Sequence, residues 1–249
     1  MVLHDDRVRC SFLNRHTPHR PIMTRRALFL VNGLGLGNST RCAAVIGRLV
    51  ELGFKVDVVT SANGLWYFRQ SLPEISVHEN LDLQYGATDG KLSVWKTLGN
   101  VPNLLRIIRQ NRNTIRTLIR DIRPDVVVTD STYVFRLSEL RDIPTVGLNN
   151  ADAVVREYSL TKGAPLNTLP QFLCVELMDD LYHKIFVDYV VSPSIAPSSH
   201  RWSGQTEPVG PIVRPQYLEQ AERRSSRDGR VVVMLSGSKF GTSVTFSRR

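Results

Sequence analysis

An apolar segment followed by a glycine-rich loop places the strongest constraint on how this chain can fold. Residues 27–32 read ALFLVN, which predicts a strand buried on both faces of a parallel sheet. The next six residues read GLGLGN, and an amphipathic pattern then predicts a helix to about Gly53, capped by Ser39 or Thr40. A glycine loop that leads into a helix brings backbone N–H groups and the positive end of the helix dipole to one place. This unit therefore predicts an anion-binding loop, whose candidate residues are Gly33, Gly35, Gly37 and Ser39.

The rest of the chain alternates between strand-like and helix-like patterns. Apolar runs predict strands at 55–60, 75–79, 125–130, 144–149 and 184–193, and a short strand begins the segment 206–215. Helical patterns cover a short stretch within 61–72 and the ranges 94–122, 132–141 and 168–183. Strands that alternate with helices form a mostly parallel sheet with helices on both faces. We therefore predict an α/β, Rossmann-like, doubly wound fold.

The glycine loop does not match either of the two common phosphate-binding motifs. A dinucleotide-binding loop needs glycine where Asn38 stands, and an acidic residue near the end of the second strand, where Thr60 and Ser61 lie. A P-loop needs a Lys-Ser/Thr pair after the glycines, and this chain has none there. One alternative stays open, namely that the loop is a tight turn that packs the helix onto the sheet.

Composition narrows the classes of partner. The 249 residues include 32 Lys+Arg against 23 Asp+Glu, a formal charge of +9 that favours anionic ligands. The three cysteines are far apart, which fits a reducing compartment and predicts no metal site. No nucleic-acid-binding motif is present, so we expect no nucleic-acid partner. Six arginines interleave with an aliphatic stripe over 106–123, which predicts either a solvated helix face or attraction to an anionic membrane surface.

Four segments together resemble the N-terminal half of GT-B glycosyltransferases, most closely those of family 28. The first is residues 27–61, from ALFLVN through the glycine loop to KVDVVTS. The others are RPDVVVTDSTY, YVVSP and EPVGPIVRP, in the family's order, and VVVMLSGSKFG resembles the start of the donor domain. The resemblance covers about residues 26–241 and includes lipid-intermediate N-acetylglucosaminyltransferases and glycolipid synthases.

The resemblance implies transfer of a hexosyl or N-acetylhexosaminyl group from a nucleotide diphosphate sugar to a lipid or other hydroxyl acceptor. It implies no metal and no cofactor, because the diphosphate sugar is itself the donor substrate. It places the acceptor in residues 26–210, an interdomain linker at 211–229 and the start of the donor domain at 230–249. Ser236, Gly237 and Ser238 would form the donor loop. A cytoplasmic protein is implied, with peripheral attachment to the inner face of the membrane as an open alternative.

Two departures from the family pattern bear on activity. Many related enzymes carry a histidine base where this chain has Asn38, and an amide cannot accept a proton at neutral pH. Asp130 matches the acidic residue of the family, and it could serve as a base or cap the next helix; capping is the reading that the sequence favours. These two residues are the candidate catalytic positions.

The second departure concerns length, because little of a donor domain fits after Ser238. We therefore expect a fragment or a frameshifted frame that is inactive alone, with residues 1–25 as a disordered leader. Two other functions stay open: a non-catalytic Rossmann-like protein that binds phosphorylated or sugar ligands, and a protein similar to nucleotide-sugar epimerases.

Overall fold

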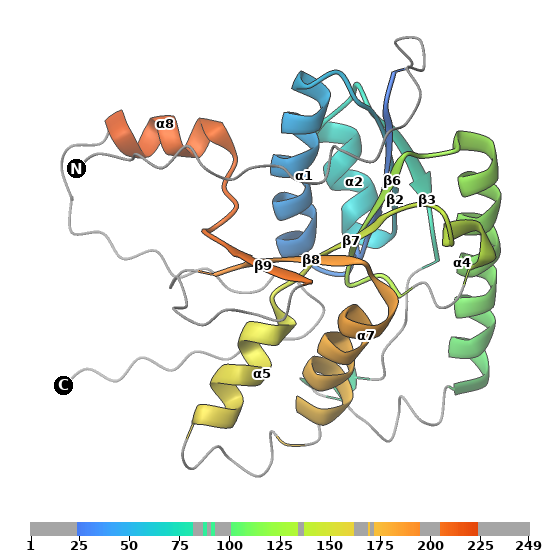
Figure 1. Ribbon diagram of the computed structural model, residues 1–249, viewed down its shortest axis with the longest axis vertical. Coiled ribbons are helices and arrows are strands. Elements are labelled where there is room, and N and C mark those ends of the chain that lie inside the picture. Colours follow the sequence, from blue (N-terminus) through green and yellow to red (C-terminus); the bar gives the residue numbers. More distant parts are fainter. Residues whose placement is uncertain are drawn as a thin grey trace.

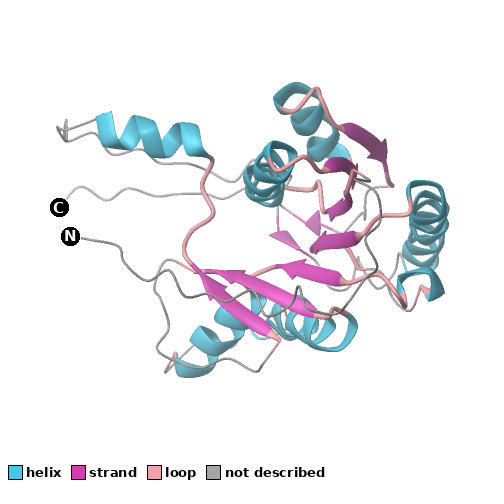
Figure 2. Cartoon of the chain, turned by 45° about the horizontal axis from the view of Figure 1, so that its top comes forward, coloured by secondary structure: helices cyan, strands magenta, loops and turns pink. Residues whose placement is uncertain are grey.

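A seven-stranded parallel sheet forms the centre of the described part of the chain (Figures 1 and 2). The computed structural model describes residues 24–81, 87–88, 91–92, 101–133, 137–161, 169, 172–194 and 205–223. The order of the strands is β3-β2-β1-β6-β7-β8-β9, and every neighbouring pair is parallel. Their bounds are β1 Arg26–Val31, β2 Lys55–Thr60, β3 Ser76–Glu79, β6 Val126–Asp130, β7 Thr145–Leu148, β8 Tyr189–Pro193 and β9 Thr206–Val209. Two short strands, β4 Ala87–Thr88 and β5 Lys91–Leu92, pair separately.

Helices cover both faces of the sheet (Figure 2). Their bounds are α1 Leu36–Glu51, α2 Ala62–Ser71, α4 Val101–Ile122, α5 Ala151–Leu160, α7 Met178–Phe186 and α8 Pro215–Arg223. A 3-10 turn covers Ser138–Leu140, and a π-helical turn covers Phe172–Leu177 directly before α7. The predicted doubly wound α/β fold is therefore confirmed.

Alternate residues of the central strands supply two cores. Phe29, with its neighbours of the same face, packs against Ile46 of α1 and Phe68 of α2. Leu28 and the other side chains of the opposite face pack against α4 through Ile115, Ile119 and Ile122. Burial on both faces explains why these strands read as continuous apolar runs.

Several predicted elements differ from those observed. Helix α1 begins at Leu36 with Gly35 as its N-cap, so the expectation that Ser39 or Thr40 caps it is wrong. Helix α5 was not predicted, and α7 ends at Phe186 instead of near residue 183. Of the helix predicted over 132–141, the described residues form only the 3-10 turn.

The charged segment predicted as a linker contains α8, whose first residue is Pro215. Proline suits the first position of a helix, because the N–H that it lacks would have no intrahelical partner there. The predicted donor-domain start at 230–249, including Ser236, Gly237 and Ser238, lies outside the described residues. So does the predicted leader, except for residues 24 and 25.

Candidate active site at the carboxyl edge of the sheet

The chain changes direction across the sheet between β1 and β6. From β1 it continues outward through β2 to β3, and it later returns to form β6 on the other side of β1. The last residues of these two strands, Val31 and Asp130, are paired in register. In open α/β sheets, ligands bind in the crevice at the carboxyl ends of the strands where the order reverses. The glycine loop after β1 and the carboxylate that ends β6 both lie at this position.

The glycines of the loop have two different tasks. Gly33 is a packing residue, because an added Cβ would overlap the carbonyl oxygen of Ser61. Gly35 and Gly37 have open space where a Cβ would be, and Gly35 is extended, with φ −118° and ψ 161°. No side chain caps α1 and its first turn holds no acidic residue, so its N–H groups have no competing side-chain anion. The backbone at Gly35 and Gly37 is therefore unobstructed, and their binding of an anion stays a prediction.

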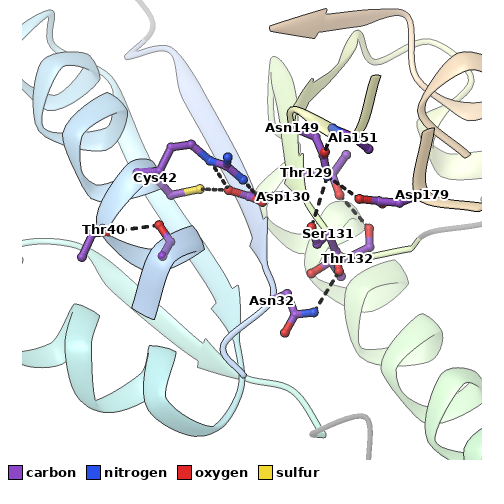
Figure 3. Close-up of polar contacts among 12 residues, drawn as sticks. Asn32, Thr40, Cys42, Thr129, Asp130, Ser131, Thr132, Asn149, Ala151 and Asp179 are labelled. Atoms are coloured by element: carbon purple, nitrogen blue, oxygen red, sulfur yellow. Dashed lines mark hydrogen bonds and ion pairs between the residues drawn. The ribbon is translucent and has the colours of Figure 1, made fainter. Parts of the chain in front are cut away.

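Asp130 is fully buried and forms a two-pronged ion pair with Arg41 (Figure 3). Arg41 Nε donates to Oδ2 at 3.0 Å, and Arg41 Nη2 donates to Oδ1 at 2.7 Å. The Cys42 thiol also donates to Oδ2, at 3.3 Å. The expectation that Asp130 caps the following helix is wrong, because its carboxylate turns to α1 instead.

Burial and charge act in opposite directions on this group. Burial raises the pKa of Asp130, and the Arg41 guanidinium opposes that rise. Burial also raises the pKa of the Cys42 thiol, and the adjacent carboxylate raises it further, so Cys42 stays a neutral donor. Burial lowers the pKa of Arg41, but the attraction of Asp130 prevails and raises it overall, which keeps the guanidinium charged. The pair is therefore an arginine held in place by a buried carboxylate.

The other candidate residues of the loop are not joined to this pair. Asn38 lies half-buried in the first turn of α1, and its side chain makes no hydrogen bond within the described part of the chain. Ser39 is fully buried, and its hydroxyl has no hydrogen-bond partner there. Asn38 and Asp130 thus do not contact each other. The residue that pairs with the Asp130 carboxylate is Arg41, about one helical turn after Asn38.

A second polar group at the same edge was not singled out from the sequence (Figure 3). Buried Asn149, which follows β7, donates from Nδ2 to Asp179 Oδ2 at 2.7 Å and to Ser131 Oγ at 3.2 Å. Asn32, which follows β1, donates from Nδ2 to the Ser131 carbonyl at 3.2 Å. The sequence did contain a signal for this group, because β1, β6 and β7 each end in or are followed by a polar residue. The carboxyl ends of adjacent parallel strands lie at one edge of the sheet, so these residues meet there.

His183 adjoins this group from α7. Its side chain is buried, and Nδ1 lies 2.8 Å from the carbonyl oxygen of Asp179. Its ring also packs against Gly147, where an added Cβ would lie 2.5 Å from Cδ2. His183 is thus a buried residue that packs α7 against β7. His78 instead lies 2.8 Å from Asp57, and His200 lies outside the described residues.

Comparison with known proteins gives the family. The model of glycosyl transferase family 1 matches residues 25–235. The chain belongs to this glycosyltransferase family. An uncharacterized glycosyltransferase of Methanosarcina mazei is 25% identical over 229 residues, which are 85% of this chain and 57% of that protein. This glycosyltransferase chain thus spans a little over half the length of its curated relative.

Solved structures support the GT-B type of fold. Phytolacca americana UGT2, solved with UDP-2-fluoro-glucose and pterostilbene, superposes with a TM-score of 0.52 at 13% identity. The match covers 83% of this chain and 58% of that one. LpCGTa, solved in complex with UDP, gives a TM-score of 0.50 at 13% identity, over 85% of this chain and 61% of the other. The predicted membership of GT-B glycosyltransferases is confirmed at the level of the family and the fold.

No helix among the residues that the structure describes is both long and apolar enough to span a bilayer. On α4, the arginine-rich helix, Arg106, Arg109 and Arg120 are exposed. Arg116 and Arg120 share one partner, Glu139, at 3.2 and 2.6 Å. The face predicted to be solvated is thus exposed, with part of its charge neutralised by that glutamate.

Proposed function

We propose that this chain carries the acceptor-binding half of an enzyme that transfers a hexosyl or N-acetylhexosaminyl group. The donor is a nucleotide diphosphate sugar, and the acceptor is a hydroxyl of a lipid or of another molecule, as in the family 28 enzymes that the motifs resemble. Residues 26–210 form the acceptor domain, 211–229 connect the domains, and residues from 230 begin the donor domain. For lipid acceptors, the exposed arginines of α4 contact an anionic membrane surface.

The group of residues at the carboxyl ends of β1 and β6 is the observation that carries this proposal. It combines an uncapped helix N-terminus, two open glycines and an arginine fixed by a buried carboxylate. Such groups stabilise negative charge, and glycosyl transfer from a diphosphate sugar leaves a diphosphate. If the loop only packed α1 onto the sheet, these groups would not be needed to stabilise a diphosphate.

Within this reaction, Asp130 acts by orienting Arg41. Both of its oxygens are engaged and its side chain is fully buried, so an acceptor hydroxyl cannot reach it directly. Arg41 uses two of its five N–H groups on Asp130, which leaves three for a phosphate or sugar oxygen. Asn38 hydrogen-bonds the acceptor through its amide, in the place where a base would stand.

One observation favours a second candidate, a protein that binds the same ligands without catalysis. Of the two candidate catalytic residues, Asn38 is an amide and Asp130 has no free oxygen. A site with these residues can bind a sugar or phosphorylated ligand without removing a proton from it. Binding and turnover must therefore be measured separately.

The deciding experiment measures both with UDP-, GDP- and dTDP-sugars and a panel of acceptors. We expect the chain to bind acceptors by calorimetry but to transfer no sugar alone. We expect turnover, detected by mass spectrometry, when the C-terminal part of the Methanosarcina mazei relative follows residue 229. Gly35→Ala, which meets no atom in this structure, should weaken binding about tenfold, or roughly 1.4 kcal/mol.

Binding without turnover in a folded chimera would favour the second candidate. The epimerase-like alternative predicts that a UDP-sugar changes its stereochemistry with no acceptor present. Unchanged affinity in Gly35→Ala would instead support the packing-turn reading of the loop.

A further inference from the structure

Ser131, the first residue after β6, has a backbone conformation that serine rarely adopts. Its φ is +51°, in the left-handed region. For a residue with a Cβ this conformation costs on the order of 1 kcal/mol, and such residues persist only where the surroundings hold them. Ser131 directly follows Asp130, which is paired with Arg41, at the carboxyl ends of β1 and β6.

Two asparagines from the neighbouring strand ends hold Ser131 on opposite sides (Figure 3). Asn32 binds its carbonyl oxygen and Asn149 binds its hydroxyl oxygen, both at 3.2 Å. Each amide is itself fixed, because Asn32 Oδ1 accepts from Leu34 N at 3.0 Å and Asn149 Oδ1 accepts from Ala151 N at 2.6 Å. Neither amide can rotate without losing these bonds, so the hydroxyl of Ser131 has a defined position.

The bond from Asn149 determines what the Ser131 hydroxyl can do. Its oxygen accepts a hydrogen from Asn149, so its own proton remains available to donate. Asn149 is a neutral amide and takes no proton from the hydroxyl, so Ser131 is arranged for hydrogen bonding. Ser131 is half-buried, so part of its surface is exposed to solvent.

The charge near Ser131 selects the kind of ligand group. Asn149 also donates to Asp179, whose second oxygen, Oδ1, is buried, lies 3.4 Å from His183 Nδ1 and accepts no hydrogen bond from the described residues. A carboxylate this close disfavours a phosphate at Ser131, while it leaves a neutral hydroxyl unaffected. Phosphate is better placed at the glycine loop and Arg41, on the opposite side of Asp130.

We propose that Ser131, held by Asn32 and Asn149, is a ligand-binding residue that hydrogen-bonds a neutral hydroxyl of the acceptor. This inference rests on the proposed function, because that function supplies the acceptor. It divides the candidate site into an anion-binding part at Arg41 and a hydroxyl-binding part at Ser131.

The test combines two substitutions at Ser131 with a matched control. Ser131→Ala removes only the hydroxyl, whereas Ser131→Gly also relieves the backbone strain. Both should weaken binding of methyl glycosides of glucose, galactose and N-acetylglucosamine at least tenfold, measured by calorimetry. Both should leave the affinity for inorganic pyrophosphate within twofold of wild type. Ser131→Gly should melt about 2–4 °C above Ser131→Ala.

Arg123→Gly is the control, because Arg123 has the same left-handed conformation, with φ +50°, at the opposite edge of the sheet. It should gain stability through the same relief of strain, with no change in affinity for either probe. Glycoside affinity within twofold of wild type in Ser131→Ala would overturn the inference. The inference would also be overturned if Ser131→Ala lost pyrophosphate binding instead of glycoside binding, or if the wild-type chain bound no glycoside.

A different result would remove the proposed function without affecting this inference. Glycoside binding that depends on Ser131, combined with no sugar transfer by the folded chimera, would leave this inference standing and remove the enzymatic proposal.

Discussion

At Asp130 the cost of burying a charge is opposed by one charged partner, Arg41, and by the Cys42 thiol. The carboxylate is fully buried, while Arg41 keeps 17% of its side-chain surface exposed. A buried ion pair adds little net stability, because the loss of hydration offsets the attraction. Such a pair is more useful for orientation, and here it fixes a guanidinium at the carboxyl edge of the sheet.

We expect Asp130→Asn to destabilise the fold by about 3 kcal/mol, because it breaks the pair and leaves the guanidinium partly buried without a counter-charge. The double variant Arg41→Met/Asp130→Leu should lose less stability than Asp130→Asn alone, because it buries no unpaired charge. Urea denaturation of the wild type, Arg41→Met, Asp130→Leu and the double variant measures the coupling energy. Additive losses would show that the two groups do not interact in solution.

The glycine loop offers a contrast among three neighbouring positions. Gly33→Ala should destabilise by about 3 kcal/mol or more, because its methyl group would overlap backbone atoms of Ser61. Gly35→Ala should stay within about 0.5 kcal/mol of wild type, and Gly37→Ala, inside α1, should gain about 0.5–1 kcal/mol. Thermal melts of the three variants would check this order. A stable Gly33→Ala protein would mean that the loop packs differently.

At the scale of elements, α4 and the 3-10 turn after β6 are linked by Glu139. Its carboxylate accepts from Arg120 at 2.6 Å and lies 3.2 Å from Arg116. Hydrogen bonding to its own backbone N–H, followed by the bonds from Arg120 and Ser138, lowers the pKa of Glu139 to about 2. Helix α4 is thus linked to the 3-10 turn by ion pairs that depend on the ionisation of Glu139.

This contact predicts a stability change at acid pH. The pKa of Glu139 is lower in the folded chain than its usual value of 4.5, so the unfolded chain binds more protons between these values. Its contribution is complete above about pH 4.5 and is lost as the pH falls toward 2. In thermal melts over this range, Glu139→Gln should therefore lose less stability than wild type. Glu51→Gln, at an exposed site on α1, controls for the removal of one charge, and an identical profile for both variants would contradict the assignment.

Across the whole molecule, stability should decrease from the centre of the sheet toward its edges. Strand β1 pairs on both sides, with β2 and β6, and residues 27–31 are all buried. Strands β3 and β9 pair on one side only within the described sheet. The two cores meet at β1, so it contributes to both at once.

Hydrogen exchange followed by mass spectrometry tests this gradient. We expect the slowest amide exchange in β1, β2 and β6, because those amides open only with the sheet as a whole. The amides of β3 and β9 should exchange faster, through local opening. Equal protection of β9 and β1 would indicate that another part of the chain covers that edge.

The doubly wound fold was accessible from the sequence because it follows from local regularities. Apolar runs such as ALFLVN and KVDVVT mark strands that are buried on both faces, and helical stretches separate them. The motif order also led to the GT-B family. Helix α5 was missed because its pattern is short, and the start of α1 was misplaced because Ser39 is a good capping residue that instead packs inside the helix.

The candidate site depended on contacts that no local pattern contains. Asp130 and Arg41 are 89 positions apart, and the sequence offered a cap or a base for Asp130 but not this partner. Asn149 and Ser131 likewise meet only because β6 and β7 are neighbours in the sheet. The sequence determined the layered fold because burial imposes a repeating pattern on neighbouring residues. The tertiary structure alone decided the polar partners, because a buried charge or amide is satisfied by whichever group the packing brings within hydrogen-bonding distance.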